Sequence, residues 1–82
     1  MAKALKYPTV FRALLEGGHI CEREPIQGPV KWTVHVNLKC IGHITENQFM
    51  DMYNADLLHH YNTRHDKNGD ALNYFILPEV DL

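Results

Sequence analysis

The sequence predicts an α+β fold, a small single domain in which helices pack on one face of an antiparallel sheet. Two segments carry apolar residues at helical spacing, one after Pro8 and one after Thr45. The segment between them alternates between apolar and polar residues, and an Asn68-Gly69 pair separates two further strand-like runs. The expected order of elements is therefore α-β-β-α-β-β.

Length and composition indicate one globular domain over residues 1–82. A chain of 82 residues has room for a single hydrophobic core. Its 45% apolar and 22% charged residues are typical of a folded protein and lack the bias of a disordered one.

The first predicted helix covers residues 8–16, because Pro8 suits a first helical turn and Gly17-Gly18 ends the periodic pattern. A strand is expected over residues 19–26. Pro25 lacks a backbone donor, so we expect this strand at an edge of the sheet.

The clearest strand is expected over residues 30–38. Its apolar residues occupy every second position, which predicts one covered face and one face open to water. The apolar set is Val30, Trp32, Val34, Val36 and Leu38. We expect Trp32 in the core.

The second predicted helix covers residues 45–58 and begins with a capping box. Thr45 can accept a hydrogen bond from the backbone of Gln48, and the Gln48 side chain can reach back to Thr45. Phe49, Met52, Tyr53 and Leu57 then mark its core-facing side.

A β-hairpin is expected over residues 59–77, turning at Asn68-Gly69. An Asn-Gly pair favours a two-residue turn with positive φ at both positions. Tyr74 and Phe75 give the last strand bulk on both faces, which predicts an interior position in the sheet.

The cysteines and the first residues of the chain indicate a cytoplasmic protein. No apolar run of signal-peptide length follows Met1, and no segment is long enough to cross a membrane. Cys21 and Cys40 are therefore expected to be reduced and buried in the core.

Metal ligands are present, but their spacing does not predict a site. Cys40 and His43 form one close pair, and its partners would have to come from the hairpin, from His59, His60 or His65. The stretch 66–70 resembles the start of a calcium loop but has Ala71 and Leu77 where that loop needs Gly and Glu. We expect no metal and no other cofactor.

Catalysis has little support in the sequence. The chain contains no serine, and neither cysteine lies in a recognisable nucleophile motif. We therefore expect a protein that is not an enzyme.

Nucleic-acid binding is the alternative function. A helix followed by a hairpin resembles the arrangement of winged-helix proteins, with the hairpin 59–77 as the wing. However, the net charge is −2, and the helix carries Glu46, Asp51 and Asp56 without any Lys or Arg, which disfavours insertion between phosphates.

A protein-interaction module is the leading interpretation. Small chains of this kind without catalytic motifs are typical of accessory proteins of phages and other mobile elements, which inhibit or modulate a larger host protein. The expected partner-binding residues lie on the second helix and near the hairpin tip: Glu46, Asp51, Asn54, Asp56, Arg64, His65 and Lys67. The polar strand face with Lys31, His35 and Lys39 is a further candidate surface. The oligomeric state stays open.

Overall fold

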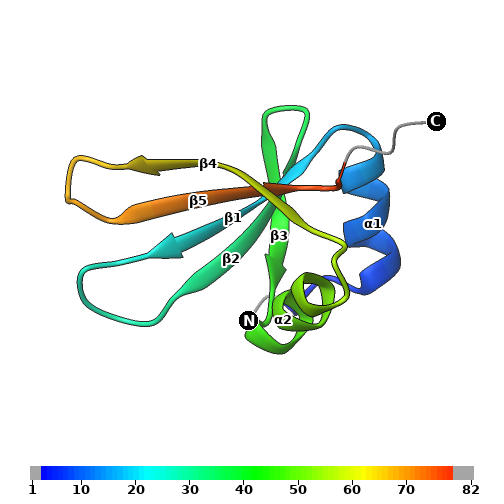
Figure 1. Cartoon of the computed structure of the whole chain (residues 1–82), viewed down its shortest axis with the longest axis horizontal. Coiled ribbons are helices and arrows are strands. Elements are labelled where there is room, and N and C mark those ends of the chain that lie inside the picture. The colour runs from blue at the N-terminus through cyan, green and yellow to red at the C-terminus, as the bar shows by residue number, and fades with distance from the viewer. Residues whose placement is uncertain (1–2, 79–82) are drawn as a thin grey trace.

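The computed structural model describes residues 3–78 and confirms a small α+β architecture. Two helices cover one face of a five-stranded antiparallel sheet (Figure 1). Along the chain the elements are α1 (Tyr7–Leu15), β1 (His19–Glu24), β2 (Lys31–Val36), β3 (Lys39–Ile44), α2 (Glu46–Asn54), β4 (His59–His65) and β5 (Ala71–Ile76). Across the sheet the strands lie in the order β3-β2-β1-β5-β4.

The predicted order of elements was wrong in one respect, because it lacked β3. The chain does not continue as one strand from 30 to 38 but reverses at Asn37 and Leu38, whose φ angles are 53° and 66°. This is the pattern of a type I′ turn, and it pairs β3 with β2. Leu38 extends the apolar alternation by chance, and its side chain is fully exposed at the turn.

β1 lies at the centre of the sheet, between β2 and β5, and not at an edge as predicted. Pro25 does not confine β1 to an edge, because the strand ends at Glu24, one residue earlier. The missing donor of Pro25 therefore falls in the loop that follows the strand. β5 lies between β1 and β4, which confirms the interior position predicted for the last strand.

Two adjacent glycines end α1 for different reasons. The N–H of Gly17 donates to the carbonyl of Leu14, and that of Gly18 donates to the carbonyl of Ala13, which together form a Schellman motif. Gly17 supplies the positive φ that this motif needs, at 93°. Gly18 is packed so tightly that an added Cβ would lie 2.7 Å from the Ala13 carbonyl oxygen and would also collide with the carbonyl of His35.

The start of α2 is confirmed, and its end comes earlier than predicted. Thr45 Oγ1 accepts from the N–H of Gln48 at 3.1 Å, and Gln48 Oε1 accepts from the N–H of Thr45 at 2.8 Å. The helix stops at Asn54 instead of residue 58, because Asp56 adopts a φ of 59° and its N–H donates to the carbonyl of Tyr53. Aspartate tolerates this left-handed conformation, but the sequence offered no glycine to mark it.

The turn between β4 and β5 also differs from the prediction. Gly69 has a φ of 88°, but Asn68 does not adopt a positive φ. The Asp66 backbone N–H donates to the carbonyl of Asp70 and the Gly69 N–H to that of Asp66, which makes a three-residue loop with a glycine bulge. The Asp66 carboxylate holds this loop by accepting from the N–H groups of Asn68 and Asp70 at 2.9 and 3.0 Å.

The core lies between the helices and the covered face of the sheet. Ile20 and Val34 are fully buried there, together with Val10 of α1 and Met52 of α2. Trp32 is only partly buried, although its ring stacks on a core phenylalanine and its Nε1–H donates to Glu22 Oε2 at 2.9 Å. The loops β1–β2 and β4–β5 project beyond the helices (Figure 1), so that end of the sheet has no helical cover.

Candidate functional site

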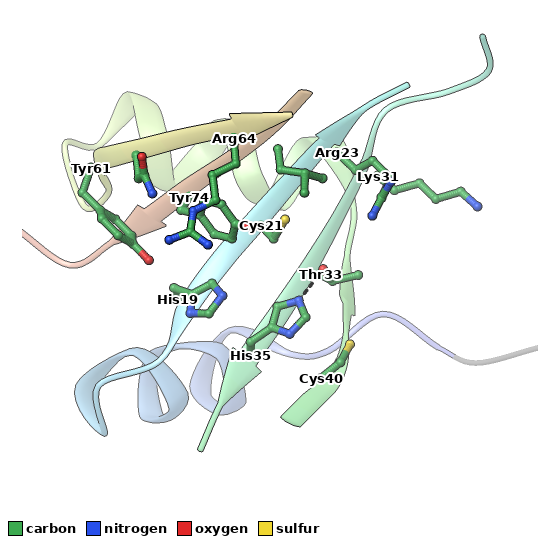
Figure 2. Close-up of a pocket in the computed structure, with 12 residues that line it drawn as sticks. His19, Cys21, Arg23, Lys31, Thr33, His35, Cys40, Tyr61, Arg64 and Tyr74 are labelled. Carbon is green, nitrogen blue, oxygen red and sulfur yellow. Dashed lines mark hydrogen bonds between the residues drawn. The ribbon is translucent and has the colours of Figure 1, made fainter. Parts of the chain in front are cut away.

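The face of the sheet opposite the helices forms a hollow of about 610 Å³ (Figure 2). All five strands contribute side chains to it. We call it the open-face hollow; the residues that matter most for its chemistry are His19, Lys31, His35, Tyr61, Arg64 and Tyr74.

Strand alternation sends these side chains to the open face. Ile20 and Val34 are buried under the helices, so their neighbours His19 and His35 point to the other side of the sheet. The register places His19 opposite His35. The polar face predicted for β2 is thus confirmed, but no pattern in the sequence indicated which strand lies beside it.

The two imidazoles form a stacked pair. Their ring centroids lie 5.0 Å apart with an angle of 8° between the planes, and Thr33 Oγ1 lies 2.8 Å from His35 Nε2. Burial lowers the pKa of both histidines, and the neighbouring His35 lowers the pKa of His19 further. These shifts favour the neutral form of both rings, which can stack and take part in hydrogen bonds.

Aromatic and cationic side chains complete the hollow. Tyr74 packs edge-on against His19 with centroids 5.4 Å apart, and Tyr61 lies 6.1 Å from Tyr74. Arg64 and Lys31 are exposed and form no ion pair within residues 3–78. No Asp or Glu in the described part of the chain lines the hollow.

A third cation of the hollow, Arg23, is held by the β4–β5 loop. Its Nη1 donates to Asp66 Oδ2 at 2.7 Å and to Asp70 Oδ2 at 3.1 Å, while Asp70 Oδ1 accepts from the N–H of Ile26. The hydrogen bond from Arg23 lowers the pKa of Asp66. The two aspartates that resemble calcium ligands in the sequence therefore bind a guanidinium and fix the loop against the end of β1.

The strand order separates the candidate metal ligands. Cys40 and His43 lie on β3 and the hairpin histidines lie on β4, at opposite edges of the sheet. Four strand spacings of about 4.8 Å put them roughly 19 Å apart. In the part of the chain that the structure describes, no three His, Cys, Asp or Glu side chains are placed to hold a metal ion.

The cysteines do not share the core position that the sequence predicted. Cys40 is exposed and Cys21 is half-buried, and both line the hollow as free thiols. Burial is the main cause of a raised pKa for Cys21, so its thiol is less reactive than an ordinary one.

The structure divides the predicted partner-binding residues between distant places. Glu46, Asp51 and Asn54 lie on α2, and Asp56 follows it, all exposed. Arg64 lines the hollow, whereas His65, its neighbour on β4, and Lys67, in the β4–β5 loop, are exposed and do not line it. The hairpin tip lies at the opposite end of the molecule from α2 (Figure 1), so these residues do not form one surface.

The exposed side of α2 contains large apolar side chains that the sequence did not reveal. Met50 is 41% exposed, and Tyr53, which we expected in the core, is 48% exposed. Leu57 lies exposed in the turn that follows. The Tyr7 hydroxyl of α1 donates to Asp51 Oδ2 at 2.9 Å and ties the two helices together at this surface.

Comparison of the chain with protein-family models, with curated proteins and with solved structures gives no match. No helix within residues 3–78 combines the length and the apolar character needed to span a membrane. The fold class and the two surfaces described above therefore carry the functional argument.

Proposed function

We propose that the protein is a non-enzymatic interaction module that binds a larger protein with a basic surface through α2. The observation that carries the proposal is the acidic, apolar surface formed by Glu46, Met50, Asp51, Tyr53 and Asn54, here called the α2 face. In the same proposal the protein acts in the cytoplasm and inhibits or modulates its partner, as small accessory proteins of phages and other mobile elements do.

The spacing of the exposed residues supports a contact surface. Glu46, Met50 and Tyr53 stand four and three residues apart, so they form one stripe along the helix. Methionine and tyrosine are enriched at protein interfaces, where methionine adapts its shape and tyrosine adds apolar area with little loss of side-chain freedom. Tyr53 packs on Phe49 and Phe75, with ring centroids 5.9 and 6.1 Å away, and is still 48% exposed. Met50 is 41% exposed on the same side of α2.

Charge specifies the kind of partner. Residues 46–58 contain Glu46, Asp51 and Asp56 and no Lys or Arg. The two carboxylates of the α2 face, with Asp56 just beyond the helix, favour a partner with a basic patch, since complementary potentials accelerate encounter and exclude acidic competitors. The tie from Tyr7 to Asp51 fixes one of these carboxylates before binding, which reduces the entropy lost on association.

The test is capture of a stoichiometric protein partner from a lysate of the source organism, followed by affinity measurements on the purified pair. Met50→Lys removes apolar contact and adds a cation, so binding should weaken about tenfold or more. Leu15→Lys is the matched control, because Leu15 is 77% exposed on α1 and lies outside the α2 face. Asp51→Asn keeps an acceptor for Tyr7 and removes the charge, which should slow association and reduce its salt dependence.

Equal affinity of wild type, Met50→Lys and Asp51→Asn for the captured protein would refute the assignment of this surface. Capture of nucleic acid alone would refute the protein-binding function.

A further inference from the structure

The carboxylates and cations of this chain are arranged unevenly. The net charge of −2 describes the whole molecule, but the open-face hollow is lined by Arg23, Lys31 and Arg64 and, among residues 3–78, by no carboxylate. Asp66 and Asp70 lie outside this lining and form ion pairs with Arg23. Lys31, on β2, and Arg64, on β4, are left as two cations without a partner in the described residues.

Tyr61 and Tyr74 lie toward the β4 edge of the hollow, on the side of Arg64 and away from Lys31 (Figure 2). Tyr61 is 48% exposed, and its ring centroid lies 6.1 Å from that of Tyr74. The Tyr74 ring in turn packs edge-on against His19, with centroids 5.4 Å apart. Figure 2 shows Tyr61 and Arg64 at the β4 side of the hollow, whereas Lys31 lies at its far rim with the end of its side chain turned outward. A ring that is exposed on one side and supported on the other is suited to accept a flat ligand.

We infer that the open-face hollow binds single-stranded nucleic acid, with a base stacked on Tyr61 and phosphates contacted by Arg64 and Lys31. Base stacking on aromatic side chains beside a cationic track is the general means by which proteins hold unpaired strands. The hollow also offers groups that can hydrogen-bond to base and sugar edges. These are the stacked rings of His19 and His35 and the hydroxyl of Thr33.

The geometry favours a single strand over a duplex. Stacking on Tyr61 needs a base whose face is free, and in a duplex the base faces are covered by their stacked neighbours. The alternative in which hairpin 59–77 acts as a free wing has weaker support, because β5 is hydrogen-bonded to β1 inside the sheet. The inference concerns the face opposite α2 and does not depend on the proposed protein partner.

The test is fluorescence anisotropy of the full chain with a labelled oligothymidylate of about 12 nucleotides. Two phosphate contacts predict that affinity falls about sevenfold between 50 and 200 mM salt. Tyr61→Ala should weaken binding about fivefold or more, whereas Tyr61→Phe keeps the stacking ring and should bind as wild type. Arg64→Ala should weaken binding and reduce the slope of log affinity against log salt concentration by the contribution of one phosphate contact. Arg12→Ala is the control, because it removes an exposed arginine of α1 on the helical side of the sheet. It should change neither the affinity for the oligonucleotide nor its salt dependence.

Unlabelled thymidine monophosphate distinguishes a strand from a free nucleotide as the ligand. If the mononucleotide binds as tightly as the oligomer, the strand is refuted and a free nucleotide takes its place. No binding of either probe at 50 mM salt, in protein whose circular dichroism is that of a folded chain, would overturn the inference. Binding that Tyr61→Ala and Arg64→Ala leave unchanged would overturn it as well.

Discussion

Leu38→Gly should stabilise the protein, although it removes a large apolar side chain. Leu38 is the second residue of the β2–β3 turn, with a φ of 66°, and its side chain is fully exposed. An L-residue in the left-handed region costs about 1–2 kcal/mol, which glycine avoids. Glycine also has more freedom in the unfolded chain, and this costs about 0.4–1 kcal/mol. The net effect is an increase of roughly 0.5–1 kcal/mol in the free energy of unfolding.

Thermal unfolding followed by circular dichroism measures this gain. For a domain of this size about 1 kcal/mol moves Tm by roughly 4–8 °C, so we expect a rise of about 3–6 °C. Leu38→Ala is the matched control, because it removes the same side chain but keeps the backbone strain, and it should give no comparable rise. A Tm below that of wild type for Leu38→Gly, or an equal gain for Leu38→Ala, would refute the reasoning.

Three other changes have defined outcomes. Gly18→Ala should lower stability by more than 1 kcal/mol and reduce the chemical-denaturation midpoint, because the added Cβ meets backbone carbonyls that cannot move aside. Thr45→Ala should cost about 1 kcal/mol through loss of the α2 cap, and an unchanged midpoint would contradict the capping box. Asp66→Asn should be less stable than wild type at pH 7, with a difference that shrinks as pH falls below about 4. The hydrogen bond from Arg23 lowers the folded pKa of Asp66, so its contribution is complete above the unfolded pKa and disappears on protonation. Urea midpoints at pH 7 and pH 3 test this, and a constant difference would refute it.

Local signals in the sequence predicted the elements whose causes are themselves local. The capping box at Thr45 and the glycine pair after α1 depend on residues within one helical turn, so both could be found without knowledge of the fold. The alternation from Trp32 to Val36 likewise assigned each side chain of β2 to its face.

Features that depend on distant residues or on the backbone alone could not be predicted in this way. The position of β1 at the centre of the sheet follows from its pairing with β5, some fifty residues later in the chain. The turn at Leu38 has no glycine, and its apolar side chain imitates a core position. The hollow was missed for the same reason, because Tyr61 and His35 come from strands that meet only through the order β2-β1-β5-β4.

The same strand order explains how a chain with a net charge of −2 can present both surfaces. Phe49 and Met52 bury one side of α2 against the covered face of the sheet. The α2 face and its carboxylates are therefore exposed on the side of the molecule opposite the hollow. Lys31 and Arg64 lie beyond the sheet on the other side. Carboxylates at the α2 face are separated from phosphates in the hollow by the sheet and the helix layer, about 10 Å thick, which is close to a Debye length at 0.1 M salt. Repulsion between the two is therefore weak, and Met50→Lys should leave oligonucleotide affinity unchanged while Tyr61→Ala leaves the affinity for a protein partner unchanged.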